Sequence, residues 1–249
     1  DYIKQNSSEI SFNNSENWVI LNSIELSIKK KIEQHGTKLQ DWNLSINRGI
    51  LTGYNDAFII DEATKNSLIT ADPKSAELIR PILRGKDIKR YTYNFANLWL
   101  IYIPWHFPLQ NDPNIKGASV KAEEEFKKQY PAVYSYLEGH KEKLSKRNKA
   151  ETGIRYEWYA LQRWGSNYSD DFNKQKLIWT PVNSEYKFTI IPERYFFNNS
   201  IFMITGNDLY YLCGILNSSL YQKYFEMVFT NGSYNYGSAS NIKKLPIIT

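Results

Sequence analysis

The apolar segments of this chain are short, and most of them come in one group. Residues 176–182, 187–192 and 200–206 are separated only by turn residues, and a fourth segment lies at 98–105. All four are rich in the β-branched and aromatic residues that favour strands. Strands and helices therefore do not alternate in the long rhythm of a doubly wound sheet. The pattern predicts an α+β fold with a mixed β-sheet and flanking helices.

A segment near the start of the chain has the periodicity of an amphipathic helix. Leu21, Ile24, Ile28 and Ile32 recur at steps of three and four residues, and lysines lie between them. Gly36 follows as a stop signal. We expect a helix that has these four residues on its apolar face.

Other helices are expected further along the chain. One begins at a capping residue, Asp72, and breaks at Pro81. Residues 119–150 carry helix formers and mixed charge, with a break at Pro131. Residues 208–229 return to a helical period.

The stretch INRGILTGYNDAFIID, residues 46–61, predicts a strand, a turn that contains Gly49 and Gly53, and a second strand that includes Ala57 and Ile60. A turn with two glycines and short polar side chains can bring its backbone close to a ligand. It can equally be an ordinary connection between strands.

Composition narrows the class of protein. The chain has one cysteine, Cys213, which excludes internal disulfides and cysteine-based metal clusters. No apolar run approaches the roughly 18 residues of a membrane-spanning helix, and no segment resembles a signal peptide. We therefore expect a soluble cytoplasmic protein without a membrane partner. A net charge of +5 and a pI near 9.0 permit a polyanionic partner.

The ends of the sequence suggest how it is organised. The chain begins at Asp1, and its methionines are Met203 and Met227, so we expect a fragment of a longer polypeptide. Residues 1–17 are rich in Asn and Ser and are expected to form a linker or tail. Residues 18–249 are expected to form one domain.

The residues that could carry chemistry give one enzymatic alternative. The chain has no glycine-rich phosphate-binding motif, and its three histidines lack the spacing of metal ligands. Asp171, Glu185 and Lys187 could surround a divalent metal, as in a nuclease. The other interpretation is a loop followed by a strand whose wet face carries Glu185 and Lys187.

Basic residues concentrate in the middle of the chain. The stretch HKEKLSKRNK, residues 140–149, has five Lys and Arg against one acid. Arg155 and Arg163 follow among tyrosines and tryptophans. Basic side chains neutralise phosphates, and arginine can read guanine in the major groove. A solvated helix face and a half-buried strand are the structural alternatives.

Six short motifs occur in an order that resembles one family. They are INRGILTGYNDAFIID, LIRPILRGKDIKRY, YEWYALQR, KLIWTPV, YLCGILNSSLYQKYF and NIKKLPI. The ordered set is similar to the TaqI-like C-terminal specificity domain of modification methyltransferases and type IIG restriction-modification enzymes. The resemblance covers residues 20–249.

The resemblance implies a target recognition domain that grips double-stranded DNA from one side. It also implies an N-terminal methyltransferase domain in the same polypeptide, which methylates adenine at N6. In fused enzymes of this family the same polypeptide also cleaves DNA. The Asn/Asp-Pro-Pro-Tyr/Phe tetrapeptide and the glycine-rich methyl-donor motif of such a domain are absent. We therefore expect neither catalysis nor a cofactor in this fragment. The parent enzyme is expected to bind S-adenosylmethionine, and magnesium if it also cleaves DNA. A scaffold that docks a catalytic subunit is a further alternative.

Motifs shared by relatives that read different sequences cannot themselves choose the sequence. Motif residues are therefore expected to contact the DNA backbone or to be architectural; they are Arg48, Thr52, Tyr54, Asn55, Lys86 and Arg90. Lys143 and Lys146 are expected to contact phosphates. The expected base-reading residues are Arg155, Arg163, Asn183, Tyr186, Asn235 and Tyr236. We expect Tyr156 and Trp158 to hold the two arginine side chains rigid.

Overall fold

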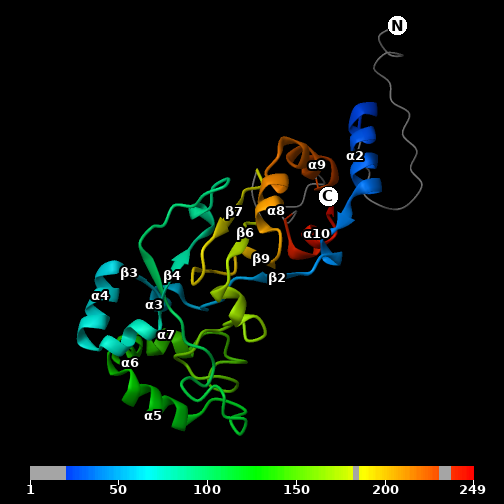
Figure 1. Ribbon diagram of the computed structural model, residues 1–249. Coiled ribbons are helices and arrows are strands. Elements are labelled where there is room, and N and C mark those ends of the chain that lie inside the picture. The colour runs from blue at the N-terminus through cyan, green and yellow to red at the C-terminus, as the bar shows by residue number, and fades with distance from the viewer. Residues whose placement is uncertain (1–20, 182–184, 230–236) are drawn as a thin grey trace.

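The fold is organised around a central sheet of four antiparallel strands. The computed structural model describes residues 21–181, 185–229 and 237–249. The strand order is β2 (Leu44–Arg48), β9 (Phe202–Gly206), β6 (Lys176–Trp179) and β7 (Phe188–Ile191). Figure 1 shows this sheet with α8 and α9 in one lobe, beside a second lobe that holds α3 to α7.

Strand β6 explains why part of the sequence reads as a continuous apolar run. Successive side chains of a strand point to opposite faces of the sheet. Leu177 and Trp179 lie in one hydrophobic core, and Ile178 lies in another. The central sheet is therefore a wall between two cores, and β6 is buried on both faces.

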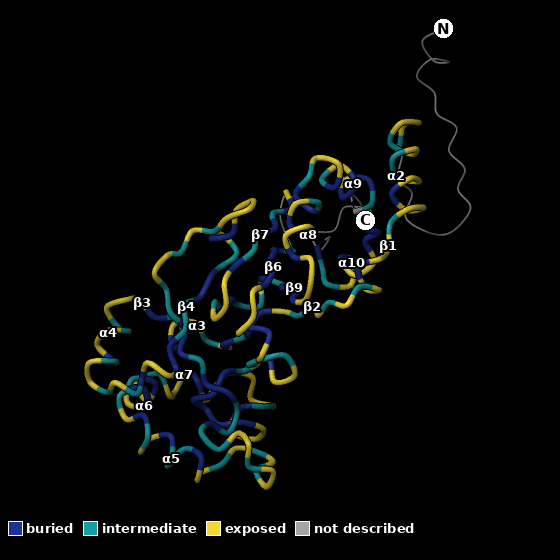
Figure 2. Tube along the Cα trace, in the orientation of Figure 1, coloured by how far each residue is buried: buried dark blue, intermediate teal, exposed yellow. Residues whose placement is uncertain are grey.

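The core on one face of the sheet draws on both ends of the described chain. It contains residues of α2 (Ser23–His35), α8 (Leu209–Leu216), α9 (Ser219–Phe229) and α10 (Ala239–Lys243). Strand β1 (Thr37–Lys38) pairs with β10 (Pro246–Ile247), which fastens the C-terminal segment beside the end of α2. Helix α2 is exposed along most of its length, as Figure 2 shows.

The core on the other face contains a second sheet. Its strand order is β3 (Ile59–Asp61), β5 (Leu98–Ile101), β4 (Ile79–Leu83) and β8 (Phe196–Phe197), with β4 and β8 parallel. The helices of this lobe are α3 (Asn55–Phe58), α4 (Glu62–Ala71), α5 (Val120–Gln129), α6 (Pro131–Glu138) and α7 (Lys141–Ser145). Short 3₁₀ turns are η1 (Leu39–Asp41), η2 (Pro73–Glu77), η3 (Gly85–Asp87) and η4 (Ser169–Asn173).

The fold class and many of the expected elements are confirmed. The chain is α+β with a mixed sheet, and β5, β6, β7 and β9 form within the four apolar segments. Pro131 separates α5 from α6. Helix α2 ends before Gly36, and the Asn22 side chain caps its first turn by accepting a hydrogen bond from the Glu25 amide. No helix within the described ranges is long and apolar enough to cross a membrane.

Two expectations about strands and helices are wrong at their boundaries. Ala57 and Phe58 belong to the single helical turn α3, so the strand expected over 57–60 begins at Ile59. The helix expected from Asp72 to Pro81 is only the 3₁₀ turn η2, and Pro81 lies inside β4. Proline has no amide hydrogen to donate to a neighbouring strand. It is tolerated at position 81 because only β5 pairs with this residue, and the pairing of β4 with β8 begins at Ile82.

Two expectations about helix faces and lengths also change. Ile24 is 70% exposed, so the apolar face of α2 is narrower than its periodicity predicts. The expected helix over 208–229 is divided into α8 and α9 at Asn217. The Asn217 side chain accepts a hydrogen bond from the Phe188 amide and donates one to the Phe188 carbonyl, so it pairs with β7 as a strand backbone would.

Strand β6 begins with a buried lysine. Lys176 is 0% exposed, and its Nζ donates to the Pro192 carbonyl at 3.3 Å. Burial lowers the pKa of Lys176 to about 7, although the charges of Glu193 and Asp171 act in the opposite direction. Above pH 7 the folded chain therefore holds this lysine largely neutral.

We expect Lys176→Met to stabilise the fold, most of all at low pH. Between the folded pKa of about 7 and the ordinary value of 10.5, the unfolded chain binds the proton more tightly, so the stability of the wild type rises with pH. This slope is at most about 1.4 kcal/mol per pH unit, and Lys176→Met should remove it. Urea unfolding from pH 6 to 10 measures both effects, with exposed Lys89→Met as the control. A variant less stable than wild type at pH 6 would contradict the prediction.

Candidate nucleic-acid interface

Four residues lie in one row across an end of the central sheet. Arg48 is the register partner of Phe202, Phe202 is the partner of Trp179, and Trp179 is the partner of Phe188. The backbone segments that continue beyond these residues therefore leave the sheet at the same end. Loops anchored at the end of a rigid sheet are a common place for binding residues.

A tight hairpin packs against this end of the sheet. Ile88 and Tyr93 form its bridge, and the Lys89 amide donates to the Thr92 carbonyl. The Tyr91 amide donates to the Phe188 carbonyl at 3.1 Å, which joins the hairpin to β7. In Figure 1 the chain after β4 lies beside β7.

The turn before the hairpin is held by a buried ion pair. Arg84 donates to both oxygens of Asp87, at 3.0 and 2.9 Å, and the Arg84 amide donates to the same carboxylate. Burial would raise the pKa of Asp87, but the hydrogen bonds from Arg84 outweigh it and hold that pKa below its usual range. The G-x-D part of the motif is therefore architectural, and it fixes the direction of the residues on either side.

Three cations of this turn and hairpin are available to a partner. Lys86, Lys89 and Arg90 are exposed, and within the described residues their side chains form no ion pair or hydrogen bond. Lys86 and Arg90 were expected from the motif, whereas Lys89 was not singled out. Its signal in the sequence is its place between the two, in KDIKR.

Two arginines lie on the segments next to this turn. Arg48 is exposed and donates through Nε to the Asn199 carbonyl, and the neighbouring Ser200 lies near Gly85 of the turn. Arg163 is also exposed, and its backbone forms a bridge with Leu51. Burial raises the pKa of Tyr168, while the charges of Arg48 and Arg163 both act to lower it, so the two arginines share one electrostatic environment.

A further cation lies where the glycine-bearing turn ends. Lys143 of α7 donates to the Tyr54 hydroxyl at 3.0 Å and lies over the ring, with Nζ 5.3 Å from its centre. The preceding Gly53 has a φ of 77°, and a Cβ there would meet the Gln162 and Arg147 side chains. We call the six exposed cations of these adjoining segments the basic band: Lys86, Lys89, Arg90, Arg48, Arg163 and Lys143.

The other motif residues of the turn are partly internal. Thr52 is buried, and its hydroxyl donates to Asn55 Oδ1 at 2.6 Å. Asn55 itself is exposed at the start of α3. The structure thus gives Thr52 an architectural position and leaves the Asn55 amide group at the surface.

The arginine that anchors this region is Arg147. From the sequence alone it is only one member of the basic run 140–149. It is 6% exposed and donates to four main-chain carbonyls, those of Thr52, Leu144, Trp158 and Ala160. Burial lowers the pKa of Arg147 to about 10, so it remains charged at neutral pH. This one side chain joins the 48–55 turn, α7 and the 158–160 segment.

The expected aromatic support for Arg155 and Arg163 is not present. Tyr156 and Trp158 are buried, and the guanidinium near the Tyr156 ring, 6.0 Å from its centre, is that of Arg147. Arg155 is exposed and lies 3.8 Å from Glu151. The alternation of basic and aromatic residues in 153–164 therefore reflects aromatic side chains that face the core and arginines that face the solvent. It does not form a surface on which the aromatic rings stack against the arginines.

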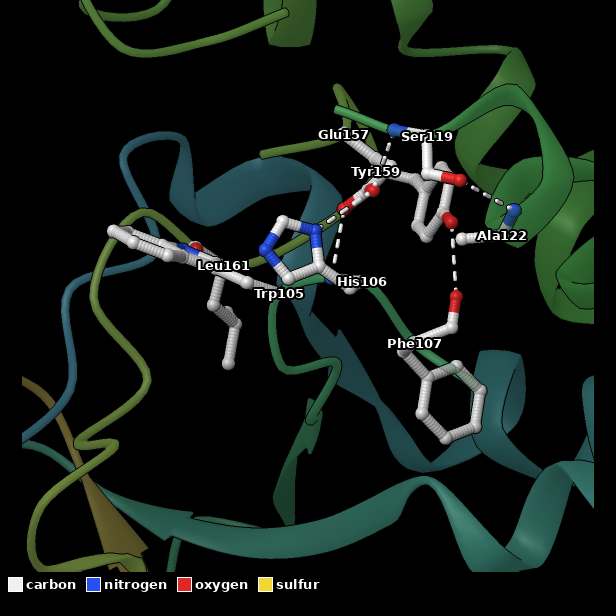
Figure 3. A network of polar contacts seen from close by, with 8 residues as sticks. All are labelled: Trp105, His106, Phe107, Ser119, Ala122, Glu157, Tyr159 and Leu161. Carbon is white, nitrogen blue, oxygen red and sulfur yellow. Dashed lines mark hydrogen bonds and ion pairs between the residues drawn. The ribbon is translucent and has the colours of Figure 1, made fainter. Parts of the chain in front are cut away.

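A buried carboxylate fixes the other side of the same segment. Glu157 is 3% exposed and accepts hydrogen bonds from the amides of His106 and Ser119, at 2.8 and 2.9 Å, with His106 Nδ1 at 3.1 Å. Figure 3 shows these contacts, together with the Tyr159 hydroxyl that donates to the Phe107 carbonyl. The Ser119 hydroxyl caps α5 through the Ala122 amide, so this His, Glu and Ser are not arranged as a catalytic triad.

Of the remaining residues expected to read bases, one is buried and three lie outside the described residues. Tyr186 is 9% exposed and packs on Phe225, 4.5 Å between ring centres, so its ring belongs to the core. Asn183, Asn235 and Tyr236 lie outside the described residues. The described residues next to them adjoin each other, because the Gly237 amide donates to the Pro181 carbonyl at 3.1 Å.

Lys146 differs from its neighbour Lys143. It pairs with Glu142 at 2.5 Å on the exposed side of α7. Exposed pairs of this kind are weak and cost little to break, so the phosphate contact expected of Lys146 stays a prediction.

The structure does not arrange Asp171 and Glu185 around a common metal site, as the nuclease alternative requires. Asp171 is buried and engaged by Asn47 and Lys174, at 2.8 Å each. It precedes β6, whereas Glu185 precedes β7, and the antiparallel pairing of these strands places the two acids beyond opposite ends of the hairpin. Across the described ranges, no three His, Cys, Asp or Glu side chains are grouped so as to hold a metal ion.

Comparison with known proteins defines the class first. The family model of the TaqI-like C-terminal specificity domain matches residues 80–247, and this chain belongs to that family. The type II methyltransferase M.MjaIV of Methanocaldococcus jannaschii is 25% identical over 202 residues, which cover 79% of this chain and 61% of that protein. This chain therefore corresponds to less than two thirds of that relative's length.

Two solved structures share the fold at low sequence identity. The type IIL restriction-modification enzyme MmeI, solved in complex with DNA, gives a TM-score of 0.51 at 16% identity, over 81% of this chain and 24% of that one. The type IIG restriction endonuclease BpuSI gives a TM-score of 0.51 at 14% identity, over 91% of this chain and 26% of that one.

We expect Arg147→Met to destabilise the fold by roughly 3 kcal/mol, because buried carbonyls that lose their donor are left unsatisfied. Arg147→Lys should recover little, since one ammonium cannot reach carbonyls on three segments. Urea unfolding at pH 7 measures both, and exposed Lys146→Met next to it is the matched control, expected within about 0.5 kcal/mol of wild type. A loss below 1 kcal/mol in Arg147→Met, by the same scale, would contradict the anchoring role.

Proposed function

We propose that this chain binds double-stranded DNA through the basic band and selects the sequence at which a linked catalytic domain acts. The observation that carries the proposal is the set of exposed cations on segments that meet at one end of the central sheet. Lys86, Lys89 and Arg90 form no ion pair among the described residues, although the charge of Lys86 acts on the Asp87 carboxylate that Arg84 holds. They can therefore contact phosphates and release counterions from the DNA without breaking an internal ion pair.

Membership in the specificity-domain family supports the same role. We propose that an N6-adenine methyltransferase domain precedes this one in the parent polypeptide, and that S-adenosylmethionine, with magnesium where the parent also cuts DNA, binds there. The methyl-donor and catalytic motifs are absent from these 249 residues, which is consistent with a domain that recognises and does not catalyse. The cytoplasm, where cellular and incoming DNA are both present, is the proposed location.

A scaffold that only docks a catalytic subunit is the second candidate function. Charge placement distinguishes the two candidates, because a docking surface does not require several exposed cations on adjoining segments. The basic band therefore favours DNA as the partner.

The first test is the salt dependence of binding to a duplex of mixed sequence. We expect the logarithm of affinity to fall linearly with the logarithm of salt, and Lys89→Ala and Arg90→Ala each to reduce the slope by about 0.9. Lys30→Ala, an exposed lysine on α2 outside the band, should leave it unchanged. Fluorescence anisotropy measures the slope. Affinity that does not change between about 50 and 200 mM salt would contradict the proposal.

The second test separates sequence choice from grip. Arg163→Ala should relax the preference at one base position, because a bidentate contact to guanine contributes about 1 to 3 kcal/mol of discrimination. Lys143→Ala should weaken all sequences equally. Selection from a pool of randomised duplexes, followed by sequencing, measures both. Equal weakening of every sequence by Arg163→Ala would make this arginine a phosphate contact.

A further inference from the structure

An aromatic cavity of about 390 Å³ lies behind the hairpin of the basic band. Tyr91 and Tyr93 of the hairpin line one side, and Tyr210 of α8 lines another. Ile190 of β7 and Gln175 complete the lining used below. None of these residues was selected as a binding residue from the sequence.

Tyr91 and Tyr210 are the exposed tyrosines of the cavity lining. Tyr91 is 57% exposed and Tyr210 is 72% exposed, and they come from different elements. Tyr91 has a φ of 65°, a conformation that is strained for a residue other than glycine, and its amide donates to the Phe188 carbonyl. The hairpin therefore fixes an exposed aromatic ring at a position that glycine would occupy more easily.

The cavity lining combines a packed tyrosine with an exposed polar group. Tyr93 packs edge-on against Tyr195, with 5.3 Å between ring centres. The Gln175 side chain donates to the Tyr210 hydroxyl at 3.2 Å, and an amide of this kind offers both a donor and an acceptor to a ligand. The cavity thus combines flat apolar walls with a group that can bond to the edge of a heterocycle.

Two cations of the hairpin that lines the cavity favour an anionic ligand. Lys89 and Arg90 precede Tyr91 directly, and both are exposed without an acidic partner among the described residues. A ligand with a planar ring and a phosphate would satisfy the ring walls and the cations together. Aromatic platforms beside basic side chains are the usual means of holding unstacked nucleotides.

We propose that this cavity binds the base of a nucleotide that has left the DNA stack, with its ring against Tyr91 and Tyr210 and its phosphate at Lys89 and Arg90. The inference rests on the proposed function, since it assigns a second mode of contact to the same DNA-binding surface. Stacking of one base on aromatic side chains contributes about 1 to 3 kcal/mol, so the preference for an unpaired base should lie between about fivefold and 150-fold.

The test compares two duplexes of the same sequence, one fully paired and one with a single bulged thymine. Anisotropy measures the affinity of the 249-residue chain for each at one salt concentration. Wild type should bind the bulged duplex between about fivefold and 150-fold more tightly, the range that one stacked base supplies. Tyr91→Ala and Tyr210→Ala should bind both duplexes equally and keep the wild-type affinity for the paired one. Tyr91→Phe should keep the preference, because stacking needs the ring and not the hydroxyl.

Tyr211→Ala is the matched control. Tyr211 adjoins Tyr210 on α8 and is 45% exposed, but it stacks on Trp42 and does not line the cavity. Loss of the preference in Tyr211→Ala, or equal binding of the two duplexes by wild type, would overturn the cavity proposal while leaving DNA binding intact. Absence of binding to either duplex would overturn the proposed function as well.

Discussion

The buried guanidinium of Arg147 is the interaction on which much of the proposed DNA-binding region depends. No carboxylate of the described residues forms an ion pair with it; instead it donates to carbonyls of Thr52, Leu144, Trp158 and Ala160. A charged group without these acceptors would be too costly to bury, and the carbonyls of Thr52, Trp158 and Ala160 would each lose the donor that the guanidinium supplies. The glycine-bearing turn, α7 and the 158–160 segment are therefore stable only together, and they carry Arg163 and Lys143 with them.

A second constraint comes from the hydrophobic cores. Because β6 sends alternate side chains into both cores, the central sheet cannot shift relative to either lobe without loss of packing. The row from Arg48 to Phe188 is held by this sheet, and the Arg84–Asp87 pair holds the adjoining turn. The exposed cations are thus carried by loops on a rigid base, which is what recognition of a regular duplex requires.

The sequence allowed prediction of the fold class, the central strands and the family, because each depends on local periodicity or on motif order. It could not show that Arg147 is internal, since its basic run reads the same for a solvated helix face. Tyr156 and Trp158 were misjudged for a related reason: alternation with arginines indicates that aromatic residues face one side, but not what covers them. Tyr91 shows no signal at all, because its exposure follows from a hairpin turn that its residue type disfavours.

The pairing of distant strands limits how such a domain can be exchanged between related genes. β2 pairs with β9, and β4 pairs with β8, so early and late parts of the chain are interleaved in both sheets. A crossover in the middle of the gene would separate these partners, and a hybrid would have to rebuild two cores at once. The segment from Arg84 to Tyr93, by contrast, is one continuous piece that contacts the central sheet through the Tyr91 amide. Replacement of the whole domain or of a single surface loop would therefore keep these strand pairings, whereas joining two halves would not.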